Sequence, residues 1–169
     1  MTQSSTSLQT RPVTEADAAT ISTLHARVFG PGRFVRTAYR IREGTPFASP
    51  YCRAALLDGR MVASLRMTPV RIGGEPRALM LGPLAVDPDF ANQGYGRRLI
   101  AECVDLARAN GERLVILVGD MSYYGRLGFK PVLPPGRICL PGPADPARIL
   151  ALELEPGAAD AYRGLVTGA

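Results

Sequence analysis

Two glycines at the start of a predicted helix form the segment of this chain whose residue types could do chemistry. Gly94 and Gly96 follow a short loop, and an amphipathic helix is predicted over residues 94–110. Glycine lets the backbone approach a ligand closely and adopt φ values that other residues avoid. The first N–H groups of a helix lack helical partners and lie at the positive end of its dipole. With Arg97 and Arg98 beside them, these groups predict a pyrophosphate-binding site.

Two other phosphate-binding motifs are similar to this segment but fit it less well. A nucleotide P-loop has Lys followed by Ser or Thr after its last glycine, where this chain has Arg97 and Arg98. The dinucleotide fingerprint has a third glycine at the position of Leu99, and Asp120 would be its ribose-binding acid. A motif that follows an antiparallel meander leaves too little chain for a doubly wound sheet. A helix start without a ligand is the remaining alternative for the loop alone.

A second segment follows in residues 124–129 (YGRLGF), and the two segments together resemble a known family. Residues 91–96 (ANQGYG) stand where the GNAT superfamily of acyl-CoA-dependent N-acetyltransferases has its Gln/Arg-x-x-Gly-x-Gly/Ala signature. The later segment matches that family's Tyr-x-x-x-Gly-Phe. Residues 119–129 and 152–158 are also similar to its bacterial YhbS-like subgroup. The chain departs from the signature at Ala91, which removes a side chain but no backbone donor.

The resemblance implies that this segment binds acetyl-CoA and transfers its acetyl group. The backbone of 84–86 would pair with the pantetheine arm, and the N–H groups of 92–97 would hold the pyrophosphate. Tyr124 would protonate the leaving thiolate, since a phenol with a pKa of about 10 carries its proton at pH 7. A packing role is the alternative for Tyr124, and its neighbour Tyr123 is expected to be structural. The backbone N–H of Val86 would polarise the acetyl carbonyl. The implied cofactor-binding residues are Leu84, Ala85, Val86, Asn92, Gln93, Gly94, Tyr95, Gly96 and Arg97.

The expected reaction is direct transfer to a primary amine, with no metal and no covalent enzyme intermediate. Cys103 falls on the predicted buried helix face, and Cys52 and Cys139 have no partner nearby in the sequence. The single histidine, His25, lies in a predicted first helix as a packed or capping residue, which disfavours most hydrolase mechanisms and a zinc site. The alternative function is a catalytically degenerate acyl-CoA-binding sensor or partner-binding module.

The sequence identifies no general base. Asp87 and Asp120 are expected to be capping or turn residues, and Glu43 and Glu75 are loop carboxylates with nothing to single them out. A chain of water molecules is the alternative.

The basic residues are almost all arginines, with Lys130 the one lysine among 20 Lys and Arg and a net charge of +5. Arginine suits bidentate binding of phosphate or carboxylate, although a GC-rich genome would produce the same bias. A basic helix predicted over 33–42 carries Arg33, Arg36, Arg40 and Arg42, which suggests an acidic or phosphorylated acceptor or else a solvated basic face. Nucleic acid is not expected as a partner, because basic and acidic residues are mostly interspersed.

The predicted elements give one α/β domain over residues 1–169. Its mixed, mostly antiparallel sheet is flanked by helices and opened by a bulge at Gly82-Pro83 in the fourth strand. Residues 1–7 are expected to be a disordered tail, and 134–169 an extension that closes the acceptor side. No apolar run approaches the ~20 residues of a membrane span, and no secretory signal begins the chain, so we expect a cytoplasmic monomer or homodimer. The strands are predicted at 8–13, 53–57, 61–72, 76–86, 113–119, after 129 and at 150–154, and the helices at 14–28, 33–42, 94–110 and 120–127.

Overall fold

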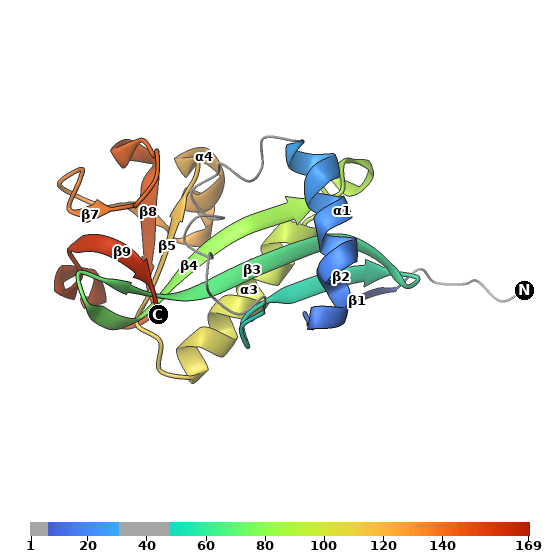
Figure 1. Cartoon of the computed structure of the whole chain (residues 1–169), viewed down its shortest axis with the longest axis horizontal. Helices are drawn as coiled ribbons and strands as arrows, with labels where there is room; N and C mark the ends of the chain where they lie inside the picture. The colour runs from blue at the N-terminus through green and yellow to red at the C-terminus, as the bar shows by residue number, and fades with distance from the viewer. Residues whose placement is uncertain (1–6, 31–47) are drawn as a thin grey trace, which may run out of the picture.

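The computed structural model describes residues 7–30 and 48–169, which form a single mixed sheet with helices on both faces (Figure 1). Helix α1 lies across one face of the sheet and α3 across the other. In chain order the elements are β1 (Leu8–Pro12), α1 (Ala18–Phe29), β2 (Arg53–Leu57), β3 (Arg60–Ile72), β4 (Glu75–Val86), α3 (Tyr95–Ala109), β5 (Leu114–Val118), α4 (Met121–Tyr124), β6 (Lys130–Pro131), β7 (Ile138–Cys139), β8 (Ile149–Glu153) and β9 (Gly164–Gly168).

The sheet is mostly antiparallel, as the sequence predicts. Its order is β1-β2-β3-β4-β5-β8-β6, with β9 paired to β3 and to β7. Strands β4 and β5 are parallel because α3 carries the chain back between them. The predicted meander β2-β3-β4 turns at Asp58-Gly59 and at Gly73-Gly74, and all four of these residues have positive φ, as two-residue hairpins of this hand require.

The sheet opens between β4 and β5, and the cause is the predicted bulge. Leu65 faces Leu84 and Met67 faces Leu81, so Gly82 and Pro83 together oppose the single residue Arg66. Before the bulge, β4 pairs with β5 from Ala78 to Met80. Beyond it β4 pairs with β3 alone, while the end of β5 pairs with β8. The strands therefore separate, leaving one edge of β4 uncovered.

Apolar side chains on each face of the sheet fix the two helices. The α3 side is the larger core, and it holds the predicted inward residues Leu99, Ile100, Cys103 and Ala107, all nearly inaccessible to solvent. On the other face Ile21 and Leu24 of α1 pack with Ala54 and Ala85. Because α3 is anchored along its length by this burial, its first turn is held against the open end of β4.

Helix α1 begins at the predicted capping box. The carboxylate of Asp17 accepts a hydrogen bond of 2.9 Å from the Thr14 backbone N–H and two of 2.7 Å from the Arg11 guanidinium. The hydrogen bond from Arg11 is the main reason that the pKa of Asp17 is lowered to about 2. A carboxylate whose folded-state pKa lies below its unfolded value stabilises the protein above the unfolded pKa and ceases to do so as pH falls.

We therefore expect Asp17→Asn to lower the free energy of unfolding at pH 7 by about 1 kcal/mol, a modest figure since Arg11 is 43% exposed. The difference from wild type should shrink as pH falls from about 4 to 2, where Asp17 gains its proton. Urea unfolding at several pH values measures it. Asp105→Asn, on the exposed face of α3, is the matched control, and a pH-independent difference would contradict this role for Asp17.

Two predictions about the fold need comment. The strand predicted at 150–154 is β8, but it is not the last, because β9 follows and pairs with the C-terminal end of β3. The basic helix predicted over 33–42, with its four arginines, lies outside the described residues.

Among the residues that are described, no helix is long and apolar enough to cross a membrane.

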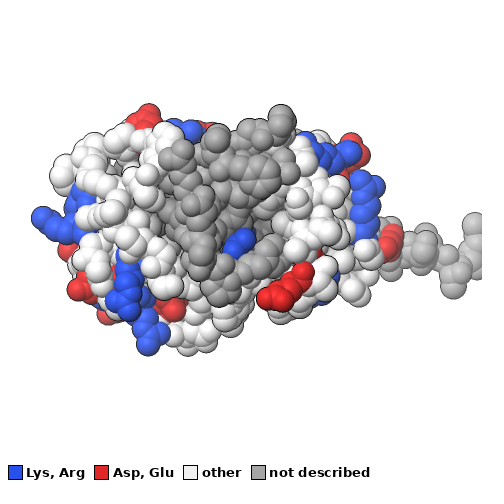
Figure 2. Space-filling model, viewed as in Figure 1, with Lys and Arg blue, Asp and Glu red and all other residues white. Residues whose placement is uncertain are grey.

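Charges on the described surface are mixed in sign. Basic and acidic side chains lie close together toward both ends of the face in Figure 2. Arg27 illustrates this, as it pairs with Asp89 at 2.8 Å and with Asp87 at 3.3 Å.

Candidate active site

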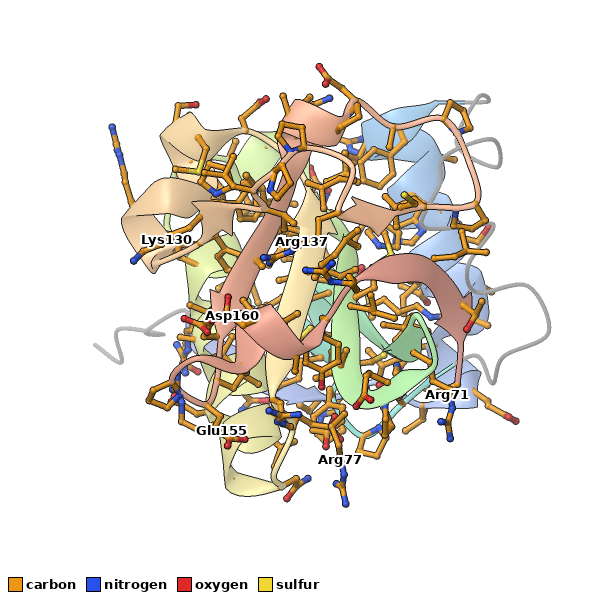
Figure 3. All side chains as sticks on the ribbon, turned by 90° about the vertical axis from the view of Figure 1, so that its left-hand side faces the viewer. Arg71, Arg77, Lys130, Arg137, Glu155 and Asp160 are labelled. Atoms are coloured by element: carbon orange, nitrogen blue, oxygen red, sulfur yellow. The ribbon has the colours of Figure 1, made fainter. Side chains whose placement is uncertain are left out.

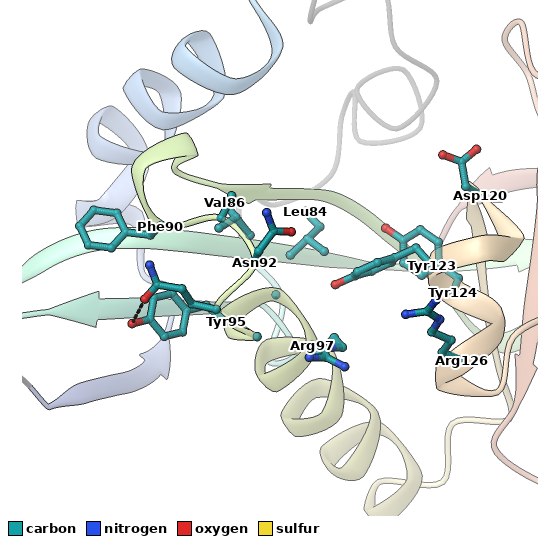
Figure 4. Close-up of a pocket in the computed structure, with 14 residues that line it drawn as sticks. Leu84, Val86, Phe90, Asn92, Tyr95, Arg97, Asp120, Tyr123, Tyr124 and Arg126 are labelled. Atoms are coloured by element: carbon teal, nitrogen blue, oxygen red, sulfur yellow. Dashed lines mark hydrogen bonds between the residues drawn. The ribbon is translucent and has the colours of Figure 1, made fainter.

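A cavity of about 570 Å³ lies at the opening of the sheet, between the end of β4, the start of α3 and helix α4 (Figure 4). It brings together nearly all the residues to which the sequence assigns chemistry. Those among its described lining residues are Leu84, Val86, Asn92, Gln93, Gly94, Tyr95, Gly96, Arg97 and Tyr124. Ala85 is one exception, because its buried side chain faces the α1 side of the sheet and only its backbone could serve the cavity. Arg98 is the other, because it is exposed and is not part of this described lining.

The loop before α3 presents backbone donors to this cavity. Asn92 and Gly94 have φ values of +63° and +82°, which turn the chain into the helix. The first α-helical hydrogen bond runs from the Arg98 N–H to the Gly94 oxygen at 3.0 Å, so the N–H groups before it have no helical acceptor. Arg97 folds back over this turn, with its guanidinium 3.7 Å from where a Cβ on Gly94 would lie. The arrangement suits a polyanion such as pyrophosphate.

Asp87 anchors the base of the loop. Its carboxylate is 3% exposed and accepts a 2.9 Å hydrogen bond from the Asp89 N–H, as expected for a capping residue. Arg60 at 3.1 Å and Arg27 at 3.3 Å complete its surroundings. Burial by itself would raise the pKa of Asp87, but the Asp89 hydrogen bond and the two arginines lower it on balance. The carboxylate oxygens of Asp87 are thus engaged by the loop backbone and by two arginines, as expected for a structural residue.

The uncovered edge of β4 offers the backbone of Leu84 and Val86. The N–H of Asp87 donates to the Val62 oxygen of β3 at 2.8 Å. Because successive N–H groups alternate sides along a strand, those of Val86 and Leu84 point away from β3, toward the gap. This is the direction that a carbonyl-polarising role for the Val86 N–H requires.

Two tyrosines of α4 extend toward β4 and the start of α3 (Figure 4). Their rings pack edge to face, with centroids 4.9 Å apart. Tyr123, expected to be structural, also lines the cavity, and its hydroxyl lies 3.3 Å from where a Cβ on Gly96 would be. Burial raises the pKa of Tyr123, with Arg97 opposing the shift. The sequence did not predict that Tyr123 lines the cavity, since of the two tyrosines only Tyr124 falls on the Tyr-x-x-x-Gly-Phe motif.

A second cavity, of about 270 Å³, opens on the far side of Tyr124. Its described walls come from the bulge in β4 and the ends of α1 and β5, with Pro143 and Arg148 of the C-terminal segment. Tyr124 and Leu84 line both cavities. Of the residues that line this cavity, the sequence singled out only Tyr124, Leu84 and the Gly82-Pro83 bulge.

Asp120 lies at the capping position expected for it, at the start of α4. Its side chain, however, makes no cap hydrogen bond and contacts Arg148 instead, at 3.2 Å. Asp120 is also the one carboxylate among the described residues that line the larger cavity.

Gly119 sets the position of the Tyr124 ring. A Cβ at this residue would lie 2.5 Å from Cε2 and 2.8 Å from Cδ2 of Tyr124, closer than real contacts allow. Because the resemblance assigns Tyr124 the role of proton donor, we expect Gly119→Ala to displace its ring and lower kcat by about tenfold or more. Gly125→Ala, whose Cβ would meet only the flexible end of Met121, is the control in the same loop. Steady-state kinetics on both variants test this, and equal kcat values would refute it.

None of the cysteines belongs to either described lining. Cys103 is fully buried, its thiol donates to the Tyr51 oxygen at 2.8 Å, and burial raises its pKa to about 12. A thiol with such a pKa is not a nucleophile at neutral pH. Cys52 is buried and Cys139 exposed. His25 is buried and packs against Phe29, in line with its expected packing role. The described residues contain no group of three or more His, Cys, Asp or Glu side chains that could hold a metal ion.

A splayed mixed sheet with a helix N-terminus at its opening is the architecture of acetyltransferases of known structure. The fold covers 100% of this chain and 93% of the YhbS structure from Escherichia coli in complex with CoA, with a TM-score of 0.84 and 26% identity. It also matches a GNAT acetyltransferase from Brucella melitensis in complex with acetyl-CoA, with a TM-score of 0.73 and 26% identity, over 98% of this chain and 97% of the other.

The chain belongs to the acetyltransferase (GNAT) family, whose sequence model matches residues 20–129. It is 30% identical over 115 residues to the uncharacterized N-acetyltransferase YhbS of Escherichia coli, covering 68% of each chain. It is 29% identical over 120 residues to the uncharacterized N-acetyltransferase YjhQ of the same organism, covering 69% of this chain and 66% of YjhQ. The sequence matches thus span about two thirds of these relatives, and the expected family and fold are confirmed.

Proposed function

We propose that the protein is an N-acetyltransferase that transfers the acetyl group of acetyl-CoA directly to a primary amine. The observation that carries this proposal is that Tyr124 and Leu84 line two cavities at once. The larger one is built for a cofactor with a pyrophosphate, and the smaller one offers room for an acceptor. The thioester and the amine would meet at Tyr124.

Each part of the larger cavity has a separate task in this proposal. The N–H groups of residues 92–97, with Arg97, bind the pyrophosphate, and the open edge of β4 at 84–86 pairs with the pantetheine arm. The CoA and acetyl-CoA bound to the two similar solved structures support this assignment. The cavity of about 570 Å³ falls within the range of about 300–1,000 Å³ that is usual for ligand sites.

In this transfer the Val86 N–H and the Tyr124 hydroxyl are the groups of the chain that act on the thioester. The amine nitrogen forms a bond to the acetyl carbon while the Val86 N–H stabilises the charge that develops on the carbonyl oxygen. The carbon–sulfur bond breaks, and the Tyr124 hydroxyl gives its proton to the thiolate sulfur. The proton lost by the amine passes to water, from which the phenolate is reprotonated. The inert Cys103 supports direct transfer over a covalent enzyme intermediate.

The C-terminal segment has a place in the same proposal. Pro143 and Arg148 line the smaller cavity, and β8 extends the sheet beside β5. Residues 134–169 would then close the acceptor side of one domain; strands β8 and β9 of this segment face the viewer in Figure 3.

An acyl-CoA-binding module without activity is the second candidate, and Ala91 is the observation that favours it. Ala91 lines the cavity where the family signature has a Gln or Arg side chain. One fewer side chain at the phosphates weakens binding but leaves the transfer machinery at Tyr124 intact.

Calorimetric titration with acetyl-CoA, CoA and NADH tests the binding step, and mass spectrometry of an amine library incubated with acetyl-CoA tests the transfer. We expect both CoA compounds to bind, NADH not to bind, and acetylated amines to accumulate. Binding without acetylation of any amine would favour the sensor, and absence of binding would exclude both candidates.

A further inference from the structure

The smaller cavity contains one charged side chain among its described lining residues, that of Arg148. The other described side chains in its lining are apolar, apart from that of Tyr124. A cation in a small cavity beside the reaction centre would orient an acceptor that carries the opposite charge.

The fold holds the backbone of Arg148 in place. Its N–H donates to the Asp145 oxygen at 2.9 Å, and its oxygen accepts from the Gly119 N–H at 3.0 Å. Gly119 is also the residue on which the Tyr124 ring rests. Because Gly119 contacts both residues, the backbone of Arg148 is held in a fixed position relative to the Tyr124 ring.

The guanidinium already binds a carboxylate, but weakly. Only Nη2 contacts Asp120, at 3.2 Å, and the two side chains are 51% and 71% exposed. Exposed pairs of this kind contribute little stability, whereas a guanidinium can bind a carboxylate with two parallel hydrogen bonds. A carboxylate inside the cavity could thus displace or share the Asp120 contact at small cost.

We propose that the acceptor is a compact primary amine that also carries a carboxylate, and that Arg148 binds this carboxylate while the amine lies at Tyr124. This proposal rests on the proposed function. The cavity volume of about 270 Å³ favours a small molecule, and the side chains of Leu81, Leu84 and Val118 in its lining suit a short aliphatic chain between the two groups.

The test compares amines that differ only in charge, using β-alanine and γ-aminobutyrate, each beside its carboxamide. Wild type should prefer the carboxylate in kcat/KM by about tenfold or more, as expected for a hydrogen bond between charged groups, and chiefly through KM. Arg148→Gln should bring the ratio close to one, and Arg148→Lys should restore part of it. Asp120→Asn should lower KM for the carboxylates by removing the competing group. Aminoethylphosphonate is a further test substrate. A higher kcat/KM for it than for both carboxylates would overturn the assignment to a carboxylate.

Arg71→Gln is the matched control, since Arg71 is exposed and projects at the lower edge of the molecule in Figure 3, outside the cavity lining. It should leave the preference unchanged. Equal use of carboxylate and carboxamide by wild type, or a preference that survives Arg148→Gln, would overturn the inference while the proposed function stands.

If wild type acetylates none of these amines, saturation-transfer NMR with the same compounds decides. Carboxylate binding lost in Arg148→Gln supports the inference, and absence of binding overturns it. Acetyl-CoA titration of the same preparations measures whether the cofactor binds. Absence of acetyl-CoA binding would count against the proposed function, whereas acetyl-CoA binding without carboxylate binding counts against the inference alone.

Discussion

Tyr124→Phe is expected to lower kcat for acetyl transfer by about 10²–10³-fold while the affinity for acetyl-CoA stays close to that of wild type. The substitution removes one hydroxyl and keeps the ring that packs on Gly119 and, at a centroid distance of 5.8 Å, on Phe129. The thiolate would then leave without a proton donor. Because this interaction arises only as the carbon–sulfur bond breaks, the loss should fall on kcat and kcat/KM alike.

Tyr123→Phe is the matched control, because its hydroxyl lines the same cavity from the neighbouring position. It lies close to Gly96 and Arg97, at the phosphate end, so its removal should change binding of acetyl-CoA by a few-fold and leave kcat nearly unaffected. Steady-state kinetics and calorimetry on both variants measure the contrast. A larger loss of kcat in Tyr123→Phe than in Tyr124→Phe would reverse the two assignments.

Local signals in the sequence were sufficient for most of the fold. Paired turn residues at Asp58-Gly59 and Gly73-Gly74 determine their hairpins without help from distant contacts. The bulge at Gly82-Pro83 was predictable because proline cannot donate to a ladder, and it accounts for the opening of the sheet. Gly94 likewise predicted the turn into α3, because glycine readily adopts the positive φ found there.

Features that depend on distant pairing could not be predicted in this way. Strand β9 has only three residues between its terminal glycines, and its pairing with β3 joins segments about a hundred residues apart. The contact between Asp120 and Arg148 has the same origin, because β8 returns beside β5 and brings the two side chains together. The smaller cavity is built from such contacts, which is why the sequence revealed the cofactor loop more fully than the acceptor side.

The second large effect, on the binding of acetyl-CoA, is expected from substitutions of Gly96. Gly96 is buried in the first turn of α3, and a Cβ there would lie 3.4 Å from the side chains of Leu84 and Val86 and 3.3 Å from the Tyr123 hydroxyl. We expect Gly96→Val to weaken acetyl-CoA binding by about 10–100-fold, since overpacking of this kind costs roughly 1–3 kcal/mol. The added methyl groups must either fill the cavity or push the N–H groups of the helix away from the phosphates.

Gly96→Ala should give a smaller loss, of a few-fold, because a single Cβ requires its neighbours to shift by only tenths of an ångström. Ala101→Val introduces the same side chain on the exposed face of the same helix and controls for the cost of a β-branched residue there. Calorimetry with acetyl-CoA, beside thermal unfolding to establish that each variant is folded, measures the series. If the start of α3 binds the phosphates, the affinity for acetyl-CoA should fall in Gly96→Ala and fall further in Gly96→Val. Ala101→Val should leave this affinity unchanged. Wild-type affinity in a folded Gly96→Val variant would mean that acetyl-CoA binds elsewhere.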